Sequence, residues 1–149
     1  MMKKIAILLN IMLLAGLLSY GQQHQMETGK LVITYENLQS SEGNVMLKLY
    51  DKNSPKFPDA KSAIAIKTVK IENKQATVIF DSLPYGVYAF TTFHDENENG
   101  KMDTNRIYFP TEGYAFSNNL HIVFGPPSFS KASFKLSESV KTIEVKLNY

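Results

Sequence analysis

The sequence predicts an all-β domain, an antiparallel β-sandwich of about seven or eight strands of the immunoglobulin or transthyretin type. Three observations predict this class. Apolar residues recur at every second position in several short segments, turn-forming residues separate these segments, and no segment has helical spacing over three turns. A closed barrel is the alternative arrangement of the same strands.

The N-terminal segment predicts export. Two lysines precede an apolar block at residues 5–18, and small residues follow at Ser19 and Gly21. This order is typical of a secretory signal peptide over residues 1–21, cleaved near Gly21. The apolar block is short for a bilayer span, so we expect no membrane span after cleavage, and an uncleaved anchor is the alternative.

The chain contains no cysteine. A bacterial lipoprotein needs a lipid-bearing cysteine at its cleavage site, so we expect an exported protein that is not a lipoprotein and has no disulfide. The mature chain of about 128 residues can bury an adequate hydrophobic core. We therefore expect a polar lead at residues 22–29 and one β-sandwich domain at 30–149, in the periplasm, at the cell surface or outside the cell.

The charge balance argues against nucleic-acid binding. Two lysines lie in the predicted signal peptide, so 14 basic residues remain, matched by 14 acidic ones. Arg106 is the only arginine, and the lysines are scattered along the chain. Nucleic-acid binding normally requires a clustered basic patch, so we expect no nucleic-acid partner.

The first half of the predicted domain contains four strand segments. Apolar and polar residues alternate from Leu31 to Tyr35 and from Val45 to Leu49, and the turn-forming residues 40–44 between them predict a hairpin. Between Ile64 and Ile71 the apolar positions change parity, which predicts a β-bulge or a change of face. A fourth strand runs from Ala76 to Phe80.

Residues 51–62, between the second and third segments, predict a loop. Pro55 and Pro58 interrupt any strand here, and the segment has room for one helical turn beginning near Asp59. Phe57 is the only large apolar side chain in this loop. We expect Phe57 to pin the loop to the domain.

The second half begins with the segment that is most apolar on both faces. Residues 87–93 are rich in aromatic and β-branched side chains, which predicts a central strand between two covering layers. This strand leads directly into His94 and Asp95 and a long loop that ends at Asn119. Two or three further strands follow, at Leu120–Phe124, Ala132–Leu136 and Ile143–Leu147.

The first half of the long loop has much of the spacing of a calcium loop. Calcium takes six to eight oxygen ligands, so a short chain must curl and turn alternate side chains inward. The side-chain oxygens at relative positions one, three, five and nine belong to Asp95, Asn97, Asn99 and Asp103. Gly100 at position six permits the sharp turn, and Lys101 at position seven would offer its carbonyl oxygen. The spacing predicts calcium as a cofactor here.

The calcium motif is incomplete. Position twelve, which carries a bidentate glutamate in the helix-loop-helix version, is Arg106. Glu112, Asn105 or a backbone carbonyl would have to complete the ligand set. The alternative is a tight turn at residues 99–100 with the neighbouring acids facing water. We expect no softer metal, because cysteine is absent and His94 and His121 have the setting of packed strand residues.

The second half of the loop, residues 108–119, combines aromatic and amide side chains. Aromatic rings can stack on sugar rings, and amide and carboxyl groups can bond to hydroxyls. The candidate ligand contacts are Glu112, Tyr114, Phe116 and Asn118. A glycan or an envelope protein would be the partner. The alternative is that the aromatic residues fold back as a lid on the core.

The sequence shows no catalytic motif. It contains no Gly-x-Ser-x-Gly elbow, no cysteine nucleophile and no phosphate-binding loop, so we assign no catalytic residue. The loop carboxylates of Asp95, Glu96, Asp103 and Glu112 could in principle form an acid pair for glycoside hydrolysis. A small glycan-acting enzyme is therefore one alternative function, and a purely structural envelope component is another.

Four motifs carry a resemblance to a known family. They are Leu83-Pro84-x-Gly86-x-Tyr88, His94-Asp95-x-Asn97-x-Asn99-Gly100-x-x-Asp103-Thr104-Asn105, Glu112-Gly113-Tyr114-x-Phe116-Ser117-Asn118-Asn119 and Gly125-Pro126-Pro127-x-Phe129. With these motifs the chain resembles the bacterial exported family of domain of unknown function 2141. The resemblance implies a secreted or periplasmic β-rich domain without an established activity. We expect an exported, non-enzymatic β-sandwich module in which calcium stabilises the loop at residues 95–103.

Overall fold

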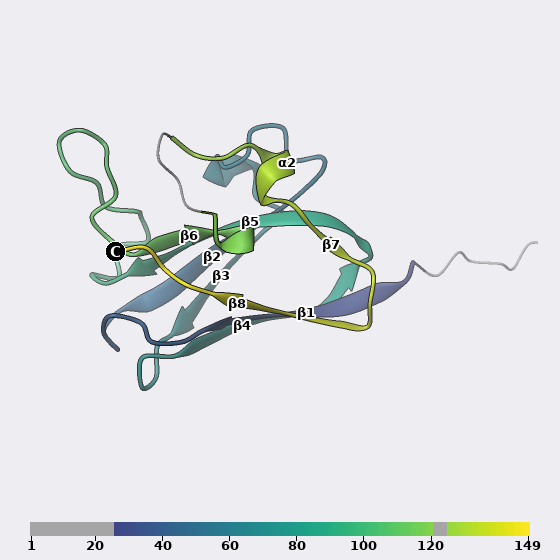
Figure 1. Ribbon diagram of the computed structural model, residues 1–149, viewed down its shortest axis with the longest axis horizontal. Helices are drawn as coiled ribbons and strands as arrows, with labels where there is room; N and C mark the ends of the chain where they lie inside the picture. The colour runs from purple at the N-terminus through teal and green to yellow at the C-terminus, as the bar shows by residue number, and fades with distance from the viewer. Residues whose placement is uncertain (1–25, 121–124) are drawn as a thin grey trace, which may run out of the picture.

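Two β-sheets face each other across one hydrophobic core (Figure 1). The computed structural model describes residues 26–120 and 125–149. The three-stranded sheet contains, in order, β4 (Ala76–Pro84), β1 (Thr28–Tyr35) and β8 (Val140–Val145). The five-stranded sheet contains β3 (Ala65–Lys70), β2 (Asn44–Asp51), β5 (Gly86–Asp95) and β6 (Tyr114–Phe116), with β7 (Phe134–Leu136) paired to the other end of β5. The predicted all-β sandwich is confirmed.

The core forms from the inward positions of both sheets. Leu31, Ile33 and Tyr35 of β1 are fully buried, as are Val45, Leu47 and Leu49 of β2. Burying alternate apolar side chains between two sheets removes them from water, and this is the main force that holds the layers together. The strand periodicities read from the sequence are confirmed for both segments.

The predicted hairpin between the first two strands is wrong. β1 pairs with β4 antiparallel and with β8 parallel, whereas β2 pairs with β3 and β5 in the other sheet. The connection between β1 and β2 crosses from one sheet to the other, with Leu38 buried on the way. Period-two alternation identifies the buried face of a strand but not its neighbour, so the turn residues 40–44 were compatible with both arrangements.

Of the two alternatives predicted between Ile64 and Ile71, the β-bulge is wrong and the change of face is confirmed, because Val69 and Ile71 pack toward the core. β3 pairs with β2 in an unbroken register, and Ile64 and Ile66 point outward with exposed fractions of 49% and 53%. Lys67 takes an inward position, where its ammonium donates to the Ile79 carbonyl and lies 4.8 Å from the centre of the Phe80 ring. A long aliphatic stem can fill an apolar position while its charged end bonds to a partner, so the apolar side chains can change face without a bulge.

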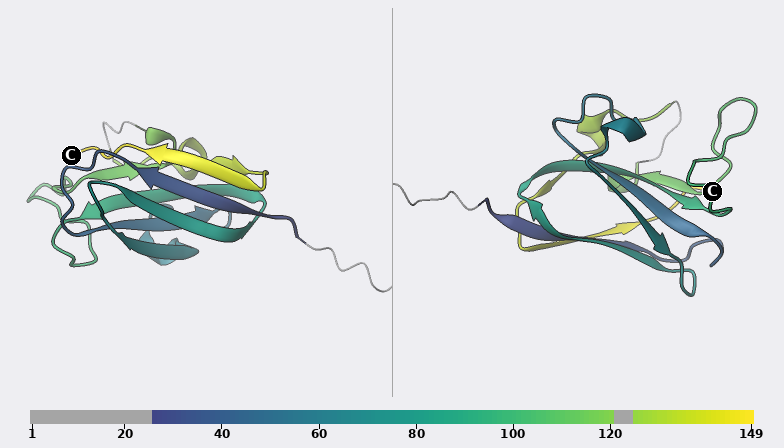
Figure 2. Two further views of the ribbon diagram at one scale, coloured as in Figure 1. Left: turned by 90° about the horizontal axis from the view of Figure 1, so that it is seen from below. Right: turned by 180° about the vertical axis from the view of Figure 1, so that it is seen from behind.

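Three short helical turns complete the described fold: η2 (Ala60–Ser62), η3 (Ser117–Asn119) and α2 (Phe129–Ala132). Of these, η2 and α2 cover the outer face of the five-stranded sheet (Figures 1 and 2). The predicted turn near Asp59 is confirmed, with the Asp59 carboxylate accepting from the Lys61 amide. Phe57 packs edge-on against Tyr50 and Phe129, so it pins the loop to the sheet as predicted.

The strands after the long loop differ from the prediction in two ways. The segment predicted at residues 120–124 falls almost entirely outside the described residues. β6 was not predicted, and the segment predicted from Ala132 divides into the end of α2 and the strand β7. Within residues 26–120 and 125–149, no helix is long and apolar enough to cross a membrane.

Candidate functional site

The long loop begins at the end of β5, where His94 is completely buried. Its Nε2 lies 2.7 Å from the Glu42 carbonyl oxygen, which can only accept a hydrogen bond, so Nε2 carries the proton. Nδ1 then accepts from the Tyr149 hydroxyl at 2.9 Å. His94 is therefore a packed, hydrogen-bonded strand residue, as predicted, whereas His121 lies outside the described residues.

Asp95 organises the first turn of the loop. It is 2% exposed, and its two oxygens accept from the backbone amides of Asn99 at 3.0 Å and Gly100 at 2.8 Å. Gly100 has φ +75°, the left-handed backbone that favours glycine. Burying a carboxylate is unfavourable unless N–H donors compensate it, and this turn supplies two of them.

Three further side chains of residues 95–103, hereafter the acidic segment, bond to one another. The Asn97 amide donates to Asp103 Oδ2 at 2.6 Å, and the Asn99 amide donates to both Asp103 oxygens. The oxygens of Asn97 and Asn99 accept from the backbone two residues further on. The fold thus brings Asp95, Asn97, Asn99 and Asp103 together around one curl of the chain.

Glu112 ties the far end of the loop to this segment. It is 6% exposed, with Oε1 accepting from the Glu96 amide at 3.1 Å and Oε2 from the Asp103 amide at 2.9 Å. From the sequence, Glu112 was a candidate metal ligand or ligand contact. In the fold its carboxylate instead clamps two backbone amides that are seven residues apart.

The donor set of the acidic segment has the chemistry that calcium prefers, but its oxygens already have hydrogen-bond partners. Asn97 and Asn99 present amide nitrogens to Asp103, so both amides would have to rotate to offer oxygen to a cation. Among the described residues, no group of three or more His, Cys, Asp or Glu side chains is arranged to hold a metal ion. Asn105, another candidate ligand, accepts from the Ile107 and Phe109 amides.

Asn105 closes a projecting turn that we call the tip turn (residues 104–110). The backbone N–H of Asn105 donates to the Phe109 carbonyl, and its backbone carbonyl accepts from the Tyr108 N–H. Thr104 also forms a β-bridge with Pro110. Ile107, Tyr108 and Phe109 are 80%, 88% and 56% exposed. Large apolar side chains held out of the core by an ordered turn are typical of a binding surface.

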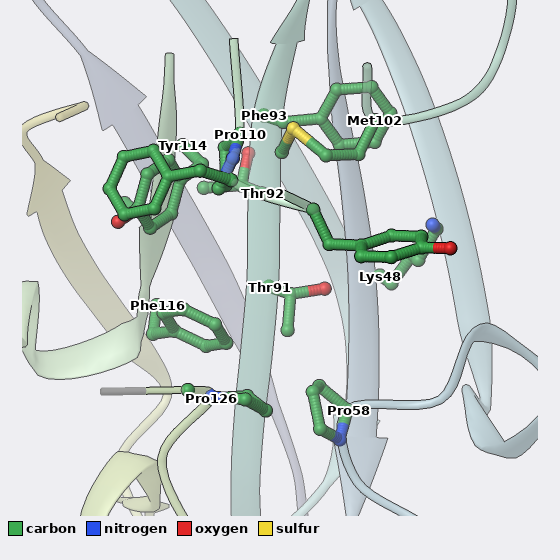
Figure 3. Close-up of a pocket in the computed structure, with 14 residues that line it drawn as sticks. Lys48, Pro58, Thr91, Thr92, Phe93, Met102, Pro110, Tyr114, Phe116 and Pro126 are labelled. Atoms are coloured by element: carbon green, nitrogen blue, oxygen red, sulfur yellow. The ribbon is translucent and has the colours of Figure 1, made fainter. Parts of the chain in front are cut away.

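The tip turn is one wall of a pocket on the outer face of the five-stranded sheet (Figure 3). Thr91 of β5 lies in the middle of the pocket, with Phe116 and Pro126 on one side and Lys48 and Pro58 on the other. The cavity has a volume of about 340 Å³, which lies in the range of small-molecule sites. Its lining residues are Lys48, Pro58, Thr91, Thr92, Phe93, Met102, Tyr108, Phe109, Pro110, Tyr114, Ala115, Phe116, Gly125 and Pro126.

Neighbouring strands build this pocket through their register. Lys48 of β2, Thr91 of β5 and Phe116 of β6 are direct cross-strand partners, and Phe93 pairs with Tyr114. Side chains that pair in this way stand side by side on one face of the sheet. Outward positions of three strands therefore form the floor, and loops supply the walls.

Among the described residues, Lys48 is the only charged side chain in the lining. Its ammonium lies 5.4 Å from the centre of the Phe93 ring, and burial lowers the pKa of the amine. None of the ion pairs among the described residues includes Lys48. The pocket therefore combines an aromatic and apolar surface with one cation.

The predicted ligand contacts separate into two pairs. Tyr114 and Phe116 line the pocket, whereas Glu112 and Asn118 do not. The Asn118 amide donates to the carbonyls of Lys131 and Ser133, so it holds α2 in place. Lys48 and Thr91 were missed by the sequence analysis, although the apolar character of residues 87–93 on both faces was a signal that the outer face is covered.

Residues 148–149 also help to position the long loop, and no sequence pattern indicated this role. Asn148 and Tyr114 exchange two backbone hydrogen bonds of 2.8 Å. The Tyr149 ring lies so close to Gly113 that any side chain there would collide with it. Because the Gly113 carbonyl also accepts from the His94 amide, this packing fixes the point where the loop returns to the sheet.

Comparison with known proteins adds a family but no ligand. None of the curated proteins and none of the solved structures matches the chain. A family of bacterial proteins, described as "Uncharacterized protein conserved in bacteria (DUF2141)", matches residues 33–144, a range that includes the acidic segment, the tip turn and all the strands of the larger sheet. The chain belongs to this family of bacterial proteins with a domain of unknown function.

Proposed function

We propose that the protein is an exported, non-enzymatic module that binds a small ligand in the pocket beside the tip turn. The observation that carries this proposal is the pairing of an open cavity of about 340 Å³ with two large apolar side chains of its lining, Tyr108 and Phe109, that are held in solvent. A ligand seated there would cover part of this surface, and removing apolar area from water favours binding by about 25 cal/mol per Å². Export rests on the character of the N-terminal segment.

The state of the carboxylates supports a role without catalysis. Asp95 and Glu112 each accept two backbone hydrogen bonds, and Asp103 accepts from two side-chain amides. An acid pair for glycoside hydrolysis needs carboxyl groups that face the substrate. No Asp or Glu of residues 26–120 and 125–149 lines the pocket. Under the rival function, a glycan-acting enzyme, Glu112→Gln would abolish turnover of a polysaccharide panel.

We also propose that calcium stabilises the acidic segment. The curl that brings Asp95, Asn97, Asn99 and Asp103 together supports this role, with the Lys101 carbonyl as a fifth oxygen. A ligand that binds only the folded state must raise its stability. Millimolar calcium should therefore raise the melting temperature relative to chelator, and Asp103→Ala should remove the difference. An unchanged melting temperature in the wild type would refute calcium binding.

The binding proposal can be tested with a variant that fills the pocket. Thr91→Trp places an indole on the pocket floor, and it also introduces a fluorophore because the chain contains no tryptophan. Thr77→Trp on β4 is the matched control, because Thr77 is exposed on the other sheet. Neutral probes such as 4-phenylbutanol should perturb the NMR signals of pocket residues in the wild type and in Thr77→Trp, but not in Thr91→Trp. Identical perturbation in all three proteins would refute the pocket as the binding site.

A further inference from the structure

We propose that the ligand of this pocket is a small organic monoanion, a carboxylate with an aromatic or aliphatic body, whose charge pairs with Lys48. This inference rests on the proposed binding function and specifies its ligand class. Charge complementarity supports an anionic ligand, because Lys48 is the only charged residue that the described part of the chain contributes to the lining. The apolar walls require that the rest of the ligand be apolar.

The setting of Lys48 provides the first argument. On the outer face of β2, Lys48 is half-buried beside Phe93 and takes part in none of the ion pairs of the described residues. Burial lowers the pKa of its amine, so the charged form is less stable here than in water. An anion placed beside the ammonium would replace the lost hydration with a charge-assisted hydrogen bond.

A comparison with Lys67 on the neighbouring strand provides the second argument. Both lysines lie over an aromatic ring, but the Lys67 ammonium also donates to the Ile79 carbonyl. The Lys48 ammonium forms no hydrogen bond to another of the described residues. The Lys67 ammonium therefore has a hydrogen-bond acceptor within the fold, whereas the Lys48 ammonium has N–H donors available for a ligand.

The Thr91 hydroxyl beside Lys48 provides the third argument. Thr91 is its cross-strand partner and lies on the pocket floor. A carboxylate has two oxygens, so one can pair with the ammonium while the other accepts from a hydroxyl. Phe93, Tyr114 and Phe116 present ring surfaces beside these groups. The geometry therefore fits a compact anionic head with an apolar body.

The experiment compares acids with alcohols of the same skeleton in the mature protein. Three pairs suffice: 3-phenylpropionate, 4-phenylbutyrate and octanoate, each against its alcohol, with Kd measured by NMR titration at neutral pH. We expect each acid to bind roughly tenfold more tightly than its alcohol, as one favourable charge-assisted contact implies. Lys48→Met should remove this preference while leaving the alcohol affinity unchanged, and Lys48→Arg should preserve it.

The controls separate this inference from the binding proposal. Lys70→Met removes an exposed lysine on β3 and should behave as the wild type. If acids and alcohols bind the wild type equally, or if Lys48→Met retains the preference, the anionic ligand is refuted but the apolar pocket stands. If neither acid nor alcohol perturbs the pocket, both proposals fail. Circular dichroism of each variant verifies that it is folded.

Discussion

The acidic segment and the pocket, whose walls include the same long loop, differ in how far their polar and apolar groups are satisfied within the fold. In the acidic segment, the buried carboxylate of Asp95 and the neighbouring Asp103 find N–H donors within the chain. In the pocket, Lys48 has no ion-pair partner among the described residues, and Tyr108 and Phe109 face solvent. Satisfied groups maintain a shape, whereas available groups offer binding energy to a ligand. The comparison assigns the acidic segment to structure and the pocket to recognition.

The largest effect should come from Asp95→Ala, which tests the structural half of this comparison. The variant leaves the Gly100 amide without its acceptor and the Asn99 backbone amide with the Asn97 oxygen alone, and the lost carboxylate is nearly inaccessible to water. We expect a loss of about 2–4 kcal/mol in the free energy of unfolding, measured by urea denaturation. Asp81→Ala is the control, because its side chain is 74% exposed. Equal losses in both variants would contradict the role given to Asp95.

Glu112→Gln should have the next largest effect. The amide can present only one oxygen, so either the Glu96 or the Asp103 backbone N–H would face an NH₂ group. A loss of about 1–3 kcal/mol in unfolding free energy is expected. Glu98→Gln, on an exposed residue of the same loop, should leave stability unchanged. A fully stable Glu112→Gln protein would mean that the carboxylate is not a clamp.

A smaller effect concerns the pH dependence contributed by Lys48. Burial lowers its folded-state pKa, so the unfolded chain holds this proton more tightly and stability rises with pH between the two pKa values. The stability of wild type relative to Lys48→Met should therefore increase as pH rises toward the ordinary lysine pKa of about 10.4. The gain should stay below about 1 kcal/mol, because water screens a half-exposed amine. A stability difference between wild type and Lys48→Met that stays constant over this pH range would contradict a lowered pKa for Lys48.

The smallest change in stability should come from the double variant Ile107→Ser/Tyr108→Ser. Both side chains are largely exposed, so their loss should alter the unfolding free energy by less than about 0.5 kcal/mol. The affinity for 4-phenylbutanol should fall severalfold, because Tyr108 belongs to the pocket lining. A strongly destabilised protein with unchanged affinity would reverse the comparison between the two halves of the loop.

Much of the site could be predicted from the sequence. The rest could not, because it depends on contacts between residues that are far apart in the chain. The spacing of Asp95, Asn97, Asn99 and Asp103 correctly indicated that one curl of chain gathers these residues. Local spacing could not reveal the hydrogen-bond partners of Glu112, because they lie 9 and 16 residues away. Lys48 reaches the pocket only through strand pairing with residues more than 40 positions later.

The sequence by itself determined the buried face of most strands, the position of the long loop and the clustering of the acidic segment, because side-chain alternation and ligand spacing are local properties. Only the tertiary structure decided that β1 pairs with β8 in parallel, that β1 and β2 belong to different sheets, and that Lys48, Thr91 and Phe116 share one outer face. Strand partners are selected by packing over long separations in sequence. The pocket is a product of that selection.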